Sequence, residues 1–306
     1  MRYLDPKADL TFKKVFGEHP DLVISFLNAL LPFETDEEEI TWVEYLNPEL
    51  VPMNPLRKDS IVDVRCRDRA GRQFIVEMQM MWTSAYKQRV LFNASKAYVS
   101  QLDRGGNYDL LQPVYSLNLV NDTFSESEAY YHDYRIVEVA ETKEVIEGLR
   151  FIFIELPKFT PKNYGDKKMQ VLWLRYLTEI GEQTREAPQE LLANPDINKA
   201  VTQLEESAFS SAQLLGYDKF WDMVSTAKMQ ISSSQREARE KGLAEGRVEG
   251  RAEGLAEGRA EGRAEGLAEG RKEADMEHAR RMRMKGYSIE DIAEITGLSP
   301  DEIAAL

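Results

Sequence analysis

Apolar residues recur at three- and four-residue spacing in several stretches of the chain, a period that predicts amphipathic helices. The pattern covers residues 10–31 and residues 84–103. It returns between about 161 and 234, for example in KKMQVLWLRYLTEIGE and YDKFWDMVSTAKM. We therefore expect two helices in the N-terminal part of the chain and a helical segment after it.

Shorter stretches that alternate apolar and polar residues, or are almost wholly apolar, predict β-strands. They are EITWVEYL from residue 39, SIVDVRCRD from 60, QFIVEMQM from 73, PVYSLNLV from 113, YHDYRIVEV from 131 and RFIFIELP from 150. RDRAGR joins the second strand to the third, and Gly71 would supply the positive φ of a tight turn there. The element order α-β-β-β-α-β predicts an α/β core over residues 1–160, followed by a helical extension over residues 161–234.

Residues 235–284 form a charged tail in which glycine recurs every four residues from Gly242 to Gly270. Leucine recurs every twelve residues, at Leu243, Leu255 and Leu267. Each interior glycine costs a helix about 1 kcal/mol, and Glu follows Glu at i+4, which is repulsive. The tail is therefore a solvated spacer, or a helix that forms against a partner helix. The alanines and leucines between the glycines favour the second interpretation and a homo-oligomer.

Residues 285–306 have the pattern of a helix-turn-helix. Ser288 would cap a first helix that Gly297 ends, and Ser299 with Glu302 forms a capping box that opens a second. Basic residues just before this segment would favour docking on DNA. The second helix, SPDEIAAL, starts with acids and carries no side chain that reads base edges. A small assembly module is the favoured interpretation.

Composition limits the class of protein. The formal net charge is −14, whereas dedicated DNA-binding proteins are usually basic. Any contact with DNA would therefore use a local patch or a bridging metal ion. No apolar stretch reaches the length of a membrane span, and the N-terminus has no signal-peptide pattern. Cys66 is the one cysteine, so no internal disulfide can form and a cytoplasmic location is expected.

Two carboxylates and an amide lie inside the most apolar strands. By alternation, Asp63 shares a face with Ile61 and Arg65, while Val62, Val64 and Cys66 take the other face. Glu77 and Gln79 share one face of the next strand. Carboxylates among apolar residues need a cation or a proton.

Asp63, Glu77 and a backbone carbonyl such as that of Met78 would suit a hard divalent ion with its waters. Mg²⁺ is the first choice, with Mn²⁺ and Ca²⁺ as alternatives. Gln79 could orient a water or a phosphate oxygen. The simpler interpretation is that both acids are solvated, or that Asp63 pairs with Arg65 or Arg89.

Four segments resemble the recombination-promoting nuclease and transposase family of the PD-(D/E)xK superfamily. They are DLTFKKVFG (Asp9–Gly17), DSIVDVRCRDRAGRQFIVEMQM (Asp59–Met80), YKQRVLFNASKAYVSQLDRGGNYDLLQPVYSLNLV (Tyr86–Val120) and FIFIELPKF (Phe151–Phe159). They keep the order of the family and together extend over about half of the chain.

The resemblance implies a restriction-endonuclease-like mixed sheet flanked by helices, and cleavage of DNA with a divalent metal. Asp63 and Glu77 match the motif acids. Gln79 lies where most of the superfamily carries lysine, so the usual charged activator of the attacking water is missing. The alternative is a catalytically weak or inactive scaffold or DNA-associated regulator that keeps the nuclease fold.

Several other residues are candidates for contact with the substrate. Arg89 could clamp a phosphate bidentately, or it could form a structural ion pair. Lys13 and Lys14 on the first helix could reach a phosphate, or they could be ordinary surface lysines. Tyr86, Tyr98 and Tyr108 could stack on bases, although core or rim positions are commoner for tyrosine.

Overall fold

The computed structural model describes residues 2–33, 35–50, 60–103, 105–161 and 168–306. Contacts divide the chain into two compact units, Met1–Lys228 and Met229–Leu306. Among the described residues no helix is long and apolar enough to cross a membrane. The boundary predicted near residue 160 adjoins residues 162–167, which lie outside the described residues.

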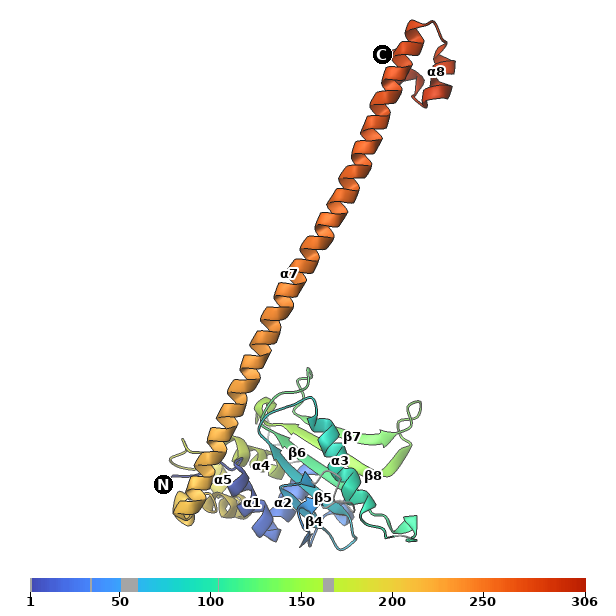
Figure 1. Ribbon diagram of the computed structural model, residues 1–306. Coiled ribbons are helices and arrows are strands. Elements are labelled where there is room, and N and C mark those ends of the chain that lie inside the picture. The colour runs from blue at the N-terminus through green and yellow to red at the C-terminus, as the bar shows by residue number, and fades with distance from the viewer. Residues whose placement is uncertain (1, 34, 51–59, 104, 162–167) are drawn as a thin grey trace. The chain divides into compact units, whose positions relative to one another are not determined.

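The first unit is built on a six-stranded mixed sheet with the order β1-β4-β5-β6-β8-β7 (Figure 1). The pairs β5–β6 and β6–β8 are parallel, and the other neighbours are antiparallel. The strands are β1 (Glu44–Tyr45), β4 (Val64–Arg67), β5 (Gln73–Gln79), β6 (Val114–Val120), β7 (Tyr131–Val137) and β8 (Val145–Glu155). A separate two-stranded sheet consists of β2 (Glu49–Leu50) and β3 (Ser60–Ile61). The mixed α/β architecture predicted from the sequence is confirmed.

Residues 10–31, predicted as one helix, form two: α1 (Asp9–Glu18) and α2 (Pro20–Leu30). His19 between them is extended, with φ −120° and ψ 93°. The residue before a proline is restricted away from the helical region, so Pro20 ends α1 and begins α2. The break lets Phe16 and Phe26 meet, with ring centroids 4.3 Å apart.

One face of the sheet buries Val64, Cys66, Phe74 and Val76 against α1 and α2, and this large apolar cluster includes residues of the segment after residue 160. That segment holds α4 (Lys168–Glu179), α5 (Gln189–Leu192) and α6 (Pro195–Thr202). Trp173 of α4 is fully buried and lies 5.3 Å from Phe26, centroid to centroid. The helical extension thus completes the core of the first unit. Short 3₁₀ turns lie at Asp36–Glu38, Tyr108–Leu110, Leu156–Lys158 and Glu206–Ala208.

The opposite face of the sheet is covered by α3 (Tyr86–Val99), whose Ala94 and Ala97 pack with Ile75. Val62 belongs to this second cluster. The prediction that Val62 shares a face with Val64 and Cys66 is therefore wrong. The stretch from residue 60 is two strands, β3 and β4, and the chain leaves regular pairing at residues 62–63 between them, so the alternation is interrupted there.

The turn between β4 and β5 fixes how these strands pair. Gly71 has φ +87°, a left-handed conformation that glycine adopts without strain, as the sequence predicted. Asp68 accepts a hydrogen bond from the Arg72 N–H at 2.9 Å and pairs with the Arg72 guanidinium at 2.6 Å. Val64 consequently faces Val76. Asp63 directly precedes Val64, and Glu77 directly follows Val76. The two acids therefore occupy the positions that would face each other next if the pairing continued past Val64 and Val76.

The glycine repeat lies within one helix, α7 (Ser211–Met284). A Cβ built at any glycine from Gly242 to Gly270 meets nothing within 4 Å. In the second unit α7 is followed by α8 (Ile289–Thr296) and α9 (Pro300–Ala304). Ser288 caps α8, Gly297 ends it with φ 70°, and Ser299 and Glu302 form the predicted capping box.

The C-terminal helices fold onto the end of α7. Ala279, Ile292, Leu298 and Ile303 form a small buried cluster. Arg283 donates to the carbonyl of Ile303 at 3.1 Å. Lys272 likewise lies 3.2 Å from Glu302. Some basic residues before the helix pair and some acids within it therefore form structural contacts.

Glu155, at the end of β8, is fully buried within a polar network. Its carboxylate lies 2.8 Å from His132 Nε2 and 2.9 Å from Lys158 Nζ, and it accepts from the Phe124 N–H at 2.9 Å. Burial raises the pKa of this carboxyl, but the contacts with Lys158, Phe124 and His132 outweigh burial and leave the pKa below its ordinary value.

We expect Glu155→Gln to lower the free energy of unfolding by roughly 3 kcal/mol at pH 7, because it leaves the Lys158 ammonium without its buried partner. A depressed folded-state pKa contributes stability above the unfolded-state pKa and loses it as the pH falls through the folded-state value. The difference between wild type and variant should therefore shrink below about pH 4. Urea unfolding across this pH range, with the exposed Glu126→Gln as the control, measures it. A difference that stays constant would contradict the assignment.

Candidate catalytic site

The structure places Asp63 beside the strand that carries Glu77. Asp63 lies between β3 and β4 and is half-buried. Its Oδ2 accepts a hydrogen bond from the Met78 N–H at 2.7 Å. Glu77 is 6% exposed. The two acids predicted from the strand pattern are thus neighbours in space, held by backbone pairing and one backbone hydrogen bond.

The Glu77 carboxylate is held from α3. Asn93 Nδ2 donates to Glu77 Oε1 at 3.1 Å, and Ser60 Oγ donates to Asn93 Oδ1 at 2.5 Å. Sequence reasoning missed Asn93 and Ser60. Asn93 had a signal, since it is a polar residue four positions after Arg89, on the same side of the predicted helix.

Arg89 reaches the site from the same helix. Its Nη2 donates to Gln79 Oε1 at 2.6 Å and lies 3.7 Å from Glu77 Oε2. The side chain of Arg89 is 46% exposed, so its guanidinium also meets solvent. Gln79 in turn donates from Nε2 to the Met81 carbonyl at 2.5 Å. Arg89 therefore brings a positive charge to the position where Gln79 supplies none.

Both acids hold their protons more tightly than usual. Burial raises the pKa of Asp63, and the Met78 N–H offsets part of that rise. Burial and then the negative charge of Asp63 raise the pKa of Glu77 to about 7, against the opposing effects of Arg89, Asn93 and Lys13. Two carboxylates in a low-dielectric place repel each other, so the pair needs a proton or a further cation.

Charged residues of α1 also act on this pair. Lys13 lies 2.6 Å from Asp9, and the two charges act on the pKa of Asp63 in opposite directions, with Lys13 lowering it and Asp9 raising it. Asp9 is a nearby acid that sequence reasoning did not single out. The structure does not bring Lys14 to the pair: its ammonium donates to the Ala208 carbonyl at 3.1 Å and lies over the Phe209 ring.

The structure also shows where the other residues considered from the sequence lie. Tyr86 is 1% exposed and donates to Asn118 Oδ1 at 3.2 Å, so it belongs to the core. Tyr108 is 81% exposed at a 3₁₀ turn. Arg65, considered as a partner of Asp63, instead donates to Gln73 Oε1 at 2.9 Å. Cys66 is fully buried among apolar residues.

The donor set suits a hard divalent cation. Within the described ranges no group of three or more His, Cys, Asp or Glu side chains is placed to hold a metal. Asp63 and Glu77 supply two carboxylates, and Mg²⁺ is commonly held by one or two carboxylates with waters and substrate phosphates. Burial and then the charge of Asp63 raise the pKa of Glu77, and a divalent ion between the two acids would favour the ionised form of both.

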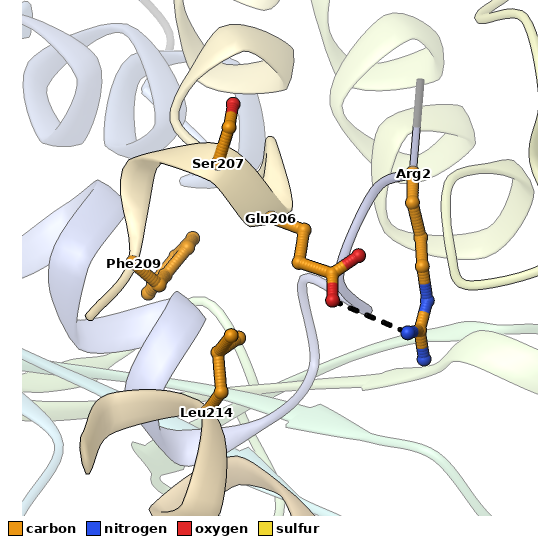
Figure 2. A pocket seen from close by; sticks show the side chains of 5 residues that line it. All are labelled: Arg2, Glu206, Ser207, Phe209 and Leu214. Carbon is orange, nitrogen blue, oxygen red and sulfur yellow. Dashed lines mark hydrogen bonds and ion pairs between the residues drawn. The ribbon is translucent and has the colours of Figure 1, made fainter. Parts of the chain in front are cut away.

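A hollow elsewhere in the first unit is distinct from this pair of acids. It has a volume of about 480 Å³ and is lined by Arg2, Glu206, Ser207, Phe209 and Leu214. Figure 2 shows Arg2 and Glu206 pointing toward one another across it, 3.2 Å apart. Its lining cation is thus already paired with an acid, and the hollow contains none of the predicted site residues.

The fold and the paired acids define a nuclease-like α/β core, and comparison with known proteins agrees. A family model described as PD-(D/E)XK nuclease family transposase matches residues 6–233. The chain belongs to this family. No curated protein and no solved structure matches the chain. The match includes the helical extension and ends before the glycine repeat.

We expect Glu77→Gln to stabilise the metal-free protein at pH 8, by about 2 kcal/mol, and to have little effect at pH 5. The folded-state pKa of Glu77, about 7, lies above the ordinary value of 4.5. Wild-type stability therefore falls as the pH rises from the unfolded-state pKa through the folded one, and the amide abolishes that loss. Thermal melting in the presence of a chelator, with Glu126→Gln as the exposed control, measures the effect. An equal change at both pH values would argue against a buried, repelled carboxylate.

Proposed function

We propose that this chain is a metal-dependent DNA endonuclease that hydrolyses phosphodiester bonds during recombination or the movement of mobile DNA. The observation that carries the proposal is the neighbouring pair of acids in a member of the PD-(D/E)XK nuclease family: the half-buried Asp63, which precedes β4 and is bonded to the Met78 N–H of β5, and the buried Glu77 on β5. Mg²⁺ is the ion we propose, with Mn²⁺ or Ca²⁺ as alternatives. The cytoplasm remains the expected compartment.

Each residue of the site has a proposed role. Asp63 and Glu77 would hold the ion, with the Met78 carbonyl as a further oxygen donor. A bound divalent ion lowers the pKa of a coordinated water and neutralises charge that develops on the phosphate. Gln79 would orient the water, since its amide is already fixed by Met81 and Arg89.

Arg89 would supply the positive charge that lysine provides in most of the superfamily. Its distance of 2.6 Å from Gln79 and its partial exposure leave the rest of its guanidinium free to contact a phosphate oxygen. Arginine presents five donors in a planar fork that suits phosphate. Lys13 is the second candidate for a phosphate contact, because its charge acts on both acids.

We expect the full chain to nick supercoiled plasmid in the presence of Mg²⁺ and to lose at least about a hundred-fold in rate on Asp63→Ala or Glu77→Ala. Arg89→Ala should slow nicking, and Arg89→Lys should restore part of the rate. The exposed Glu126→Ala is the control. If wild type and Asp63→Ala nick equally, or neither does, the alternative stands: a scaffold or DNA-associated regulator that keeps the nuclease fold.

We also propose that the chain self-associates through α7. Leu243 and Leu255 are each 56% exposed and Leu267 63% exposed, and a Cβ added at the glycines between them would meet nothing within 4 Å in the single chain. Close approach of a second helix would give these residues partners, with Glu of one helix meeting Arg of the other. Two subunits would also suit a double-strand cut.

Light scattering of the full chain should therefore give a mass above that of one chain, and a chain ending at Gln235 should be monomeric. Replacing Gly246, Gly254 and Gly262 by Ala would strengthen a lone helix by roughly 1 kcal/mol per site but obstruct close contact between two helices. If α7 mediates self-association, the variant should lose mass in light scattering, whereas a spacer helix should only gain stability. If the full chain is monomeric at micromolar concentration, α7 acts only as a spacer.

A further inference from the structure

A groove beside α3 has no role in the site described above. It lies between α3 and the strands β7 and β8, and its volume is about 250 Å³. Tyr134, Phe151, Phe153, Leu91 and Ile136 line it, together with Lys87 and Arg135. Leu91 is 49% exposed and Tyr134 40% exposed. The groove is thus an open, aromatic surface that carries the ammonium of Lys87.

Lys87 carries a charge that has no acidic partner in the part of the chain that the structure describes. Its Nζ lies 3.2 Å from the Tyr134 hydroxyl, 5.0 Å from the centroid of the Tyr134 ring and 5.1 Å from that of Phe124. The aromatic rings hold the ammonium in place by cation–π contact without neutralising it. A cation fixed in this way is ready to meet an anion.

The second cation of the lining, Arg135, is already paired with an acid. Its guanidinium lies 3.3 Å from Asp133 Oδ2, which also lies 2.7 Å from Arg150. Arg135 faces Arg150 across β7 and β8, so alternation directs its side chain away from the sheet face that carries Tyr134 and Phe153. Lys87 is therefore the cation that this groove offers to a phosphate.

The groove and the paired acids lie on the same face of the sheet. Glu77 on β5 faces Asn118 on β6, which faces Phe153 on β8. Neighbouring strands are about 4.8 Å apart, so two steps across the sheet place Phe153 about 10 Å from the backbone of Glu77. On α3, Arg89 and Asn93 reach the acids while Lys87 and Leu91 line the groove. One helix therefore borders both places.

We propose that the groove holds an unpaired nucleotide of the DNA substrate, next to the phosphate cut at Asp63 and Glu77. Its base would lie against Tyr134 and Phe151, and its phosphate against Lys87. A groove of this volume is too small for a base pair, and aromatic rings bind any base by its face. The assignment rests on the proposed nuclease function for the position of the cut. It makes gapped, flapped or frayed DNA the substrate class.

Binding of fluorescently labelled DNA to the full chain, in a chelator so that no cleavage occurs, tests this inference. The probes are a duplex and the same duplex with a short single-stranded gap. We expect the gapped duplex to bind about ten-fold more tightly. Tyr134→Ala or Lys87→Ala should abolish this preference, while Tyr134→Phe and Lys87→Arg should keep most of it. The matched controls are the exposed Tyr108→Ala and Lys219→Ala, with circular dichroism as the check on folding.

Equal affinity for both probes would overturn the inference, and so would a preference that survives the double variant Lys87→Ala, Tyr134→Ala. If that double variant lowers the mass seen by light scattering but leaves DNA binding unchanged, the groove binds protein and the inference is wrong. Because binding is read without cleavage, failure of the plasmid assay would remove the endonuclease and leave the groove as a DNA site. Failure here would leave the endonuclease proposal intact.

Discussion

The pairing of β4 with β5 is the constraint on which the site depends. A shift of one residue in an antiparallel pair turns every side chain to the other face. If β4 shifted in this way, Val64 would leave the core and Asp63 would move away from Glu77, while Val76 on β5 stayed in place. The turn at Asp68, Gly71 and Arg72 prevents this, with hydrogen bonds to both backbone and side chain. The apolar residues packed against α1 and α2 add a second restraint, because only one register buries them. A buried repulsive pair of acids is thus kept together by contacts that lie outside it.

Local pattern in the sequence predicted much of this arrangement. The alternation in QFIVEMQM and the glycine of RDRAGR predicted a strand, a turn and the side of the sheet that carries Glu77, because these depend on near neighbours along the chain. The position of Val62 was missed because pairing with β2 interrupts alternation at residues 62–63. The network of Glu155 with His132 joins residues 23 positions apart, and Ser60 and Asn93 are 33 apart. Contacts between distant segments leave no periodic signal. The spacing from Arg89 indicates the side of the helix on which Asn93 lies, but nothing in the pattern identifies Ser60 or Glu77 as its partner.

The source of positive charge distinguishes this site from one with lysine in the motif. A lysine on β5 would carry its ammonium on the same rigid strand as the acid. Here the charge comes from α3 through Arg89, and an amide lies between the guanidinium and the strand. The position of the charge then depends on how α3 packs against Ile75 through Ala94 and Ala97. Packing changes on that side of the sheet can therefore alter the electrostatics of the acids without touching them.

The four-residue period of α7 has a consequence for how this chain can vary. A helix gains about 6 Å in length and turns about 40° with each added repeat. Because a Cβ added at any of these glycines would meet nothing within 4 Å, no other segment of the single chain packs against them, and one repeat can be gained or lost without a packing defect. Each repeat gained or lost also rotates the direction in which the chain leaves the helix, and about nine repeats together complete one full rotation. The number of repeats therefore sets both the length of the helix and the direction in which the chain leaves it.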